Sequence, residues 1–348
     1  MSDSGISRRD LVRRGGLAAA AGMSVWGLAG CARRGEYVPS GAGAESGSGS
    51  VAATHLLDRG QIRIEMPTHM EPQDPNTAIM QNGADQAAKD FGVKVNFRGP
   101  DKFSIPAIQK IFDASIASKP TAIAATLPDA NALGPKIKEA VSRGIPVVLF
   151  NAGLDDYKRL GALTYVGQTE LTAGQQAGQK LAAQGLKNVI VINHQQGQLT
   201  LETRAKGVQQ GVGGGTVKEF AVDGTSPTTI KNGVAAAMRQ NPNVQALLTL
   251  GPGVAEQAMA ALDDAGKAGQ VKLATFDISP AVLQAVRTNK ILFAIDQQMF
   301  FQTYMSVMSL VSYSTWRLRP VTAVPSGPLF VDAKTAPDII TLSAKGIH

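Results

Sequence analysis

The sequence predicts an α/β fold with two parallel sheets, each covered by helices on both faces. Ten short apolar runs alternate with segments of helical periodicity, most of the runs are continuously apolar, and the pattern occurs twice along the chain. Ten strands over roughly 240 residues fit two sheets of about five strands better than one sheet.

The ten apolar runs are predicted to be strands because they are short, rich in Val, Ile, Leu and Ala, and followed by polar or glycine turns. Continuous apolar character is typical of strands that are covered on both faces. In chain order the runs are QIRIEM (61–66), VKVNF (93–97), AIAATL (122–127), PVVLFN (146–151), LTYVG (163–167), NVIVIN (188–193), VKEFAV (217–222), ALLTL (246–250), VKLATF (271–276) and ILFAI (291–295).

Eight helices are predicted between these strands, and several have clear boundary signals. Asp129 precedes the segment ANALGPKIKEAV, Gly144 and Pro146 follow it, and Ser279 with Pro280 opens the last of the eight helices. The helical stretches are roughly 77–91, 103–118, 131–143, 170–185, 199–211, 227–240, 254–267 and 279–289.

The two halves of the chain repeat one order of elements. From Gln61, and again from Asn188, a strand leads into a polar loop with a histidine, His69 or His194, and then into a helix and a strand. Right-handed crossovers would build two similar lobes from this order. Because ligands of open α/β sheets bind at the carboxyl ends of the strands, we expect the ligand site in a cleft between the lobes.

The composition is that of an ordinary globular protein long enough for two domains. The chain has 348 residues, 44% of them hydrophobic, and a formal net charge of +7. Beyond Arg33 and Arg34 the chain has no run of Lys and Arg, which argues against nucleic-acid binding.

The first 30 residues are predicted to be an export signal. SRRDLVRR (7–14) precedes the apolar run 15–30, which is shorter than the about 20 apolar residues of a membrane-spanning helix. Residues 7–11 are similar to a twin-arginine pattern, with Leu11 where that pattern often has Phe. The sequence Leu28–Cys31 is similar to a lipobox, in which the cysteine is lipidated and the chain is cleaved just before it.

Cys31 is the only cysteine of the chain, which excludes an intrachain disulfide and a cysteine metal site. Its position after small residues favours lipidation over a stray thiol on an uncleaved anchor. The Gly/Ser-rich segment that follows predicts a flexible tether with an end-to-end distance of about 25 to 30 Å. We therefore expect a folded body outside the cytoplasm that a lipid on Cys31 anchors to the membrane.

The residues just past the predicted strands are candidates for ligand binding. Most are amides and carboxylates, which can bridge the neighbouring hydroxyls of a polyol. Simpler roles stay open: a helix cap for Asp277, a turn for Asn151, and a solvated helix charge for Arg204. The strand-end residues are Thr68, His69, Asn151, Gln168, His194, Gly251, Pro252, Asp277, Asp296 and Gln297.

Three other functions have weaker support. Gly251 and Gly253 have the spacing of a dinucleotide-binding turn, but Glu256 stands where that turn needs a small third residue. A hydrolase would need Asp277 and Asp296 to lie about 5 to 10 Å apart. Four histidines without an H-x-x-x-H spacing give little support for a metal site. We expect no catalytic residue, no metal and no cofactor.

Seven segments occur in an order that points to a known family. They are NGADQAAKDFGVKV (82–95), TAIAATLPDANAL (121–133), AVSRGIPVVLFNAG (140–153), YVGQTELTAGQQAGQKLAAQG (165–185), ATFDISPAVLQAV (274–286), ILFAIDQQ (291–298) and SGPLFVDAKTA (326–336). Over about Gln61 to Ala336 the chain resembles the type I periplasmic binding proteins, specifically the ribose-binding branch of the substrate-binding proteins of ABC sugar transporters.

The resemblance implies two Rossmann-like lobes joined by three hinge crossings, which close on a ligand by a hinge motion. The crossings would lie near Tyr165–Gln168, near Gln297 and near Pro325–Phe330. The implied divisions are 1–30 for the export signal, 31–58 for the lipidated tether, 59–166 plus 298–325 for the N-terminal lobe, and 167–297 plus 326–348 for the C-terminal lobe.

The resemblance also implies which residues contact the sugar. Arg204 would be a bidentate donor, Asp277 an acceptor for paired hydroxyls, and Gln297 a mixed partner at the hinge. Many relatives have Asp where this chain has Asn151. The implied ligand-binding residues are Thr68, His69, Asn151, Arg204, Gly251, Asp277 and Gln297.

Two departures from the family leave the identity of the ligand open. Relatives commonly place Phe or Trp in the first loop, but residues 69–80 contain neither. Relatives often carry Asn and Asp where this chain has Gly251 and Pro252, which lack polar side-chain groups.

The sequence therefore predicts a monomeric, membrane-anchored solute-binding lipoprotein that delivers a sugar or sugar-like polyol to an ABC permease. The alternatives are a secreted hydrolase that uses Asp277 and Asp296 on the same lobes, and a sensory binding protein for a chemoreceptor.

Overall fold

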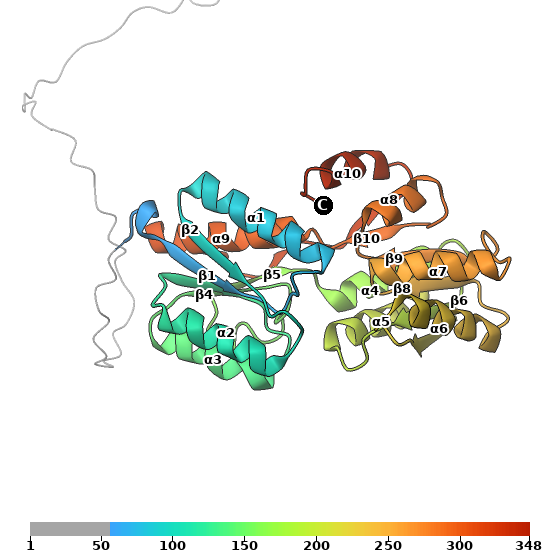
Figure 1. Cartoon of the computed structure of the whole chain (residues 1–348), viewed down its shortest axis with the longest axis horizontal. Helices are drawn as coiled ribbons and strands as arrows, with labels where there is room; N and C mark the ends of the chain where they lie inside the picture. Colours follow the sequence, from blue (N-terminus) through green and yellow to red (C-terminus); the bar gives the residue numbers. More distant parts are fainter. Residues whose placement is uncertain (1–55) are drawn as a thin grey trace, which may run out of the picture. The chain divides into compact units, whose positions relative to one another are not determined.

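The structure is a computed structural model that describes residues 56–348. Within this range the chain forms ten α-helices, one short 3-10 helix (η1, Arg59–Gln61) and twelve strands in two six-stranded sheets (Figure 1). The predicted export signal, Cys31 and residues 31–55 of the predicted tether lie outside the described residues.

The first sheet is parallel throughout and has the strand order β11-β5-β4-β3-β1-β2. Helices α1 (Pro75–Phe91) and α9 (Met299–Trp316) pack on one face, and α2 (Ile105–Ala117) and α3 (Ala130–Ser142) pack on the other. The strands are β1 (Arg63–Pro67), β2 (Lys94–Arg98), β3 (Ala122–Ala125), β4 (Val147–Phe150), β5 (Thr164–Gly167) and β11 (Val324–Pro325).

The second sheet has the order β12-β10-β9-β8-β6-β7, and its helices again cover both faces. One face carries α4 (Glu170–Ala182) and α5 (Leu199–Val212). The other carries α6 (Pro227–Gln240), α7 (Pro252–Asp264), α8 (Pro280–Arg287) and α10 (Ala336–Ser343). The strands are β6 (Asn188–Asn193), β7 (Thr216–Ala221), β8 (Ala246–Thr249), β9 (Lys272–Phe276), β10 (Ala294–Asp296) and β12 (Leu329–Val331).

Successive residues of a central strand pack into the hydrophobic cores on opposite faces of the sheet, which explains the continuous apolar runs. In β4, Val148 and Phe150 belong to the core beneath α1 and α9, whereas Val147 and Leu149 belong to the core beneath α2 and α3. All four are fully buried. A strand of this kind needs apolar residues at every position.

The predicted α/β fold and its internal repeat are confirmed. The order β5-β4-β3-β1-β2 in the first sheet corresponds to β10-β9-β8-β6-β7 in the second. The chain passes between the sheets after β5, after β10 and again between β11 and β12, which are the three crossings that the resemblance implied. The residue boundaries of the two lobes stay a prediction.

The prediction of individual helices and strands was incomplete near the C-terminus. The apolar and helical patterns did not predict α9 or α10, and only the resemblance implied a crossing near β11 and β12. β12 pairs with β10 in antiparallel fashion. The core side of α9 carries buried polar residues, and the hydroxyls of Ser306 and Ser309 donate to carbonyls four residues earlier, both at 2.7 Å. These polar residues interrupt the apolar stripe by which a buried helix is recognised.

Among residues 56–348, no helix combines the length and the apolar character that crossing a membrane requires.

Candidate functional site

Four of the predicted ligand-binding residues lie in one group that is linked by hydrogen bonds and an ion pair. Gln297 Nε2 donates to Asp277 Oδ1 at 2.7 Å, and Arg204 Nη1 lies 3.7 Å from Asp277 Oδ2. Asn151 Nδ2 donates to Gln297 Oε1 at 3.2 Å. We call Asn151, Arg204, Asp277 and Gln297, together with Glu170, the polar network. It joins the end of a strand in the first sheet to the ends of two strands in the second.

Asn151 and Asp277 are positioned by an unusual backbone conformation at the ends of β4 and β9. Both have φ of +61°, in the left-handed region where short polar side chains are the best tolerated apart from glycine. The tyrosine hydroxyl of Tyr165 donates to the carbonyl of Asn151 at 2.8 Å and supports this turn. Asn151 is thus a turn residue and a member of the polar network at once.

Arg204 is held by Glu170, a residue that the sequence analysis missed. Its guanidinium donates from Nε to Glu170 Oε2 and from Nη2 to Glu170 Oε1, the second bond measuring 3.2 Å. The ring of Phe276 lies under the guanidinium, 4.8 Å from the ring centroid to Cζ. Only 4% of Arg204 is exposed, so the solvated helix charge is excluded as its role.

Close packing of α4 on α5 brings Glu170 and Arg204 together. Gly174 and Gly178 of α4 face Gly207 and Gly211 of α5 so closely that a Cβ added to any of them would meet a backbone oxygen of the other helix at 2.0 to 2.4 Å. In each helix the charged residue stands three or four positions before the first glycine. This paired spacing is the sequence signal that could have found Glu170.

A second group of missed residues supports the hinge. Gln302 of α9 accepts from Asn151 Nδ2 at 3.1 Å and donates from Nε2 to the carbonyl of Gln297 at 2.9 Å. Ser326, between β11 and β12, donates to the same carbonyl at 2.7 Å. These buried bonds fix Gln297 at the place where two of the three crossings lie next to each other.

Burial and the neighbouring charges have opposite effects on the pKa values of Arg204 and Asp277. Burial lowers the pKa of Arg204, but the carboxylates of Glu170 and Asp277 outweigh this effect and keep its pKa above the ordinary value. Burial raises the pKa of Asp277 to about 6, although Arg204 and the hydrogen bond from Gln297 oppose the rise. Asp277 is therefore ionised at neutral pH and becomes protonated in mild acid.

The two candidates of the first loop lie outside these hydrogen bonds. Thr68 is fully buried, and its hydroxyl accepts from the backbone amide of Met70 at 3.2 Å. His69 shares a hydrogen bond of 2.9 Å between Nδ1 and the hydroxyl of Thr126, and burial lowers its pKa to about 4.

An aromatic side chain does lie beside the first loop. Phe103 is 50% exposed and packs edge-on against His69, with ring centroids 6.2 Å apart. Its amide donates to Glu71 Oε1 at 2.9 Å, which ties the loop after β2 to the first loop. Phe103 lies outside residues 69–80, the segment in which the resemblance implied an aromatic side chain, and was therefore not predicted.

Gly251 begins α7 as its N-cap, and the ring of His194 occupies the space beside it. A Cβ added to Gly251 would lie 3.1 Å from His194 Cε1. Burial and the charge of Arg204 lower the pKa of His194 to about 4, so the imidazole is neutral. The space of a side chain at position 251 is thus partly taken by a histidine from the neighbouring strand end.

The contacts of Ser279, Glu256 and Asp296 bear on the simpler roles and the other functions that the sequence left open. Ser279, and not Asp277, caps α8 by accepting from the amide of Val282 at 3.2 Å. Glu256 accepts from the hydroxyl of Ser279 at 2.8 Å, so the third-glycine position of the dinucleotide motif holds a bonded carboxylate. Asp296 pairs with His348, with Oδ2 and Nδ1 2.6 Å apart.

Two side chains of the network present polar atoms that make no direct hydrogen bond to each other. Arg204 Nη1 and Asp277 Oδ2 face each other at 3.7 Å, which is too far for a direct hydrogen bond but leaves a donor and an acceptor side by side. Within residues 56–348 no group of three or more His, Cys, Asp and Glu side chains has an arrangement that could hold a metal ion.

Comparison with known proteins agrees with this architecture. A family profile described as "Periplasmic binding protein domain" matches residues 72–315. The crystal structure of a carbohydrate transporter from Acidothermus cellulolyticus in complex with myo-inositol is similar, with 35% identity and a TM-score of 0.77. The match covers 83% of this chain and 100% of that one.

Two curated relatives are more distant. A xylose/arabinose-binding protein of Sulfolobus acidocaldarius is 23% identical over 216 residues, which are 58% of this chain and 54% of that protein. A D-ribose/D-allose-binding protein of Pseudomonas aeruginosa is 27% identical over 197 residues, 54% of this chain and 61% of that protein. The chain thus spans little more than half the length of these relatives. Because the family profile covers most of the chain, the protein belongs to the periplasmic binding protein family, whose members are extracytoplasmic solute-binding proteins.

Proposed function

We propose that the protein is a solute-binding lipoprotein that captures a sugar or a sugar-like polyol and delivers it to an ABC importer. The ligand-binding residues in this proposal are Thr68, His69, Asn151, Arg204, Gly251, Asp277 and Gln297. The protein would act as a monomer outside the cytoplasm, on a lipid attached to Cys31, and would catalyse no reaction.

The observation that carries the proposal is the unused hydrogen-bonding capacity of the polar network. Arg204 Nη1 and Asp277 Oδ2 lie 3.7 Å apart, so one ligand hydroxyl can accept from the first and donate to the second. Asn151 donates two bonds from Nδ2, and its Oδ1 has no partner among the described residues. Donors and acceptors this close suit adjacent hydroxyls on a ring.

The relatives support the same class of ligand. The similar structure from Acidothermus cellulolyticus holds myo-inositol, a ring of hydroxyls without a carboxylate or a phosphate. The curated relatives are named for xylose, arabinose, ribose and allose. We propose a cyclic polyol of this size, with the exposed Phe103 available to pack against the C–H face of its ring.

The experiment is a thermal-shift screen of the full chain against sugars and cyclitols, led by myo-inositol, xylose, arabinose, ribose and allose. A true ligand at one hundred times its dissociation constant stabilises the folded state by about 2.7 kcal/mol. Asparagine has the shape of aspartate and tolerates the same left-handed backbone conformation. We therefore expect Asp277→Asn to leave the fold intact and to weaken ligand binding by roughly tenfold to a hundredfold.

The matched control is Asp263→Asn, which changes an exposed aspartate of α7 in the same way. It should leave the affinity unchanged. If no sugar or cyclitol raises the melting temperature, or if Asp277→Asn binds the ligand as tightly as the parent does, the proposed site is wrong.

The ligand affinity should also depend on pH with a midpoint near 6. Above this pH Asp277 is a carboxylate that accepts hydrogen bonds from hydroxyls; below it, the proton removes an acceptor. At pH 5 we expect binding about tenfold weaker than at pH 7.5, measured by titration calorimetry. The Asp277→Asn variant should bind the ligand with the same affinity at both pH values. If the affinity of the parent protein is also the same at both pH values, the role given to Asp277 is wrong.

The anchoring part of the proposal has a separate test. Cys31→Ser should move the protein from the membrane fraction to the soluble fraction after cell breakage, because it removes the only thiol that could be lipidated. Incorporation of radiolabelled palmitate should be lost with it. Retention of the variant in the membrane fraction would contradict the lipobox interpretation.

A further inference from the structure

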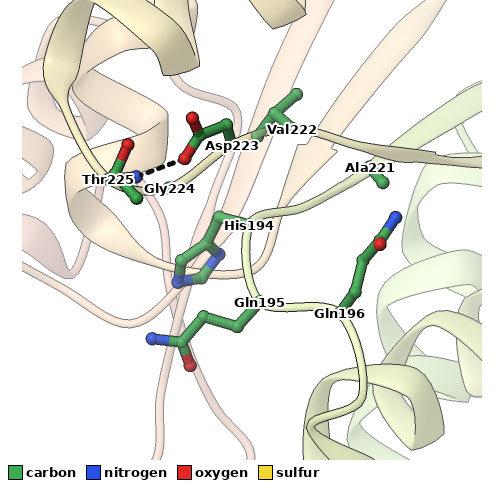
Figure 2. Close-up of a pocket in the computed structure, with 8 residues that line it drawn as sticks. All are labelled: His194, Gln195, Gln196, Ala221, Val222, Asp223, Gly224 and Thr225. Carbon is green, nitrogen blue, oxygen red and sulfur yellow. Dashed lines mark hydrogen bonds between the residues drawn. The ribbon is translucent and has the colours of Figure 1, made fainter.

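A hollow lies at the carboxyl ends of β6 and β7. Figure 2 shows its lining residues, which come from the loop after β6, the last residue of β7 and the loop after β7. Its volume is about 510 Å³, within the range of about 300 to 1,000 Å³ that is common for small-molecule sites. The lining residues are His194, Gln195, Gln196, Ala221, Val222, Asp223, Gly224 and Thr225.

His194 lies between this hollow and Gly251, one of the ligand-binding residues proposed above. Its ring abuts Gly251, where an added Cβ would lie 3.1 Å from Cε1, and its carbonyl oxygen would lie 2.5 Å from a Cβ added to Gly224. Arg204 is close enough for its charge to disfavour protonation of the ring. His194 therefore lines the hollow and also borders Gly251, one of the proposed ligand-binding residues.

The ring of His194 has hydrogen-bonding capacity that the described chain does not use. Its Nδ1 is buried and has no partner. A buried N–H without an acceptor is rarer than a buried acceptor without a donor, so the neutral ring should carry its proton on Nε2. Nε2 is then a donor, and nothing within residues 56–348 accepts from it.

The remaining lining groups suit a hydroxylated partner. Gln195 and Gln196 are exposed and offer amide donors and acceptors. Hydrogen bonds from Thr225 lower the pKa of Asp223, which keeps this carboxylate ionised as an acceptor. None of the lining residues is lysine or arginine, and the lining contains the carboxylate of Asp223, so a phosphate is not favoured.

We infer that this hollow is a second subsite that binds a hydroxylated unit joined to the ring held by Arg204, Asp277 and Gln297. The favoured ligand is then a two-unit molecule, a disaccharide or the glycoside of a cyclitol. This inference rests on the proposed function, because the first unit occupies the site proposed there.

Titration calorimetry with the full chain tests the inference with paired probes. The single-unit probes are myo-inositol and D-xylose, and the two-unit probes are galactinol, a galactoside of myo-inositol, and xylobiose. We expect one of the two-unit probes to bind at least tenfold more tightly than its single-unit partner. Gln195→Trp, which fills the hollow, should remove this advantage and change single-unit binding by less than twofold.

The control variant is Gln240→Trp, the same change at an exposed glutamine at the end of α6, which should alter neither affinity. Two-unit probes that bind no more tightly than single-unit probes would overturn the second subsite and leave the proposed function intact. The same holds if Gln195→Trp weakens both classes equally. If neither class binds the parent protein, the proposed function fails and the inference fails with it.

Discussion

Replacing Glu170 by alanine is expected to destabilise the folded protein by about 3 to 5 kcal/mol. The guanidinium of Arg204 is 4% exposed and donates two hydrogen bonds to this carboxylate. Without Glu170, the arginine stays buried with only the longer contact of 3.7 Å to Asp277. The loss should appear as a lower midpoint in urea unfolding at an unchanged m-value.

Two further variants separate a buried unpaired charge from a general loss of packing. Glu139→Ala breaks an exposed pair with Arg143, whose side chains are 35% and 56% exposed, and should cost about 0.5 kcal/mol or less. Glu170→Leu combined with Arg204→Met removes both charges and should recover most of the stability lost in Glu170→Ala. A cost below about 1 kcal/mol for Glu170→Ala would mean that the pair contributes as little as a surface pair.

Gly207→Leu should destabilise the protein by roughly 3 kcal/mol, near the upper end of the range for over-packed interiors. Its added Cβ would lie 2.4 Å from the carbonyl oxygen of Leu171 on α4, so the two helices would have to separate. Separation would also move Arg204, three residues earlier, away from Glu170. Thermal unfolding and ligand affinity should therefore worsen together.

Gly253→Leu provides the matched control for this helix contact. Gly253 is an exposed residue of the first turn of α7, and a Cβ added there meets no atom within 4 Å. Because leucine favours a helix more than glycine does, the stability should stay equal or rise by up to about 1 kcal/mol. If both leucine variants behave alike, close approach of α4 and α5 is not what requires glycine at position 207.

The central strands and most helices could be predicted because their burial leaves a simple pattern. Strands such as β4 need apolar residues on both faces, and Ser279 and Pro280 mark a helix start by local chemistry. The helices and strands after residue 298 were harder to predict because their burial leaves no simple pattern in the sequence. In α9 buried serines satisfy their hydroxyls within the helix, and β11 and β12 are two and three residues long.

The strand-end rule selected Asn151, Asp277 and Gln297, which the structure brings together in the polar network, because each directly follows a strand. It could not find Glu170 or Gln302, which lie on helices and reach the network through tertiary packing. It also missed Phe103, because the partner of the first loop comes from a different loop. Of these three residues only Glu170 has a signal in the sequence, which is the matching spacing of a charged residue and two glycines on α4 and on α5.

The left-handed backbone at Asn151 and Asp277 limits how this site can evolve. Glycine would keep the conformation and delete the head group, whereas glutamine or glutamate would keep a head group and strain a backbone with φ of +61°. Exchange between asparagine and aspartate is the one change that preserves both. A single nucleotide substitution can make this exchange, and it alters the charge of the polar network without altering the size of the side chain. Changes of charge at these two positions are therefore open to substitution, whereas changes of side-chain length are not.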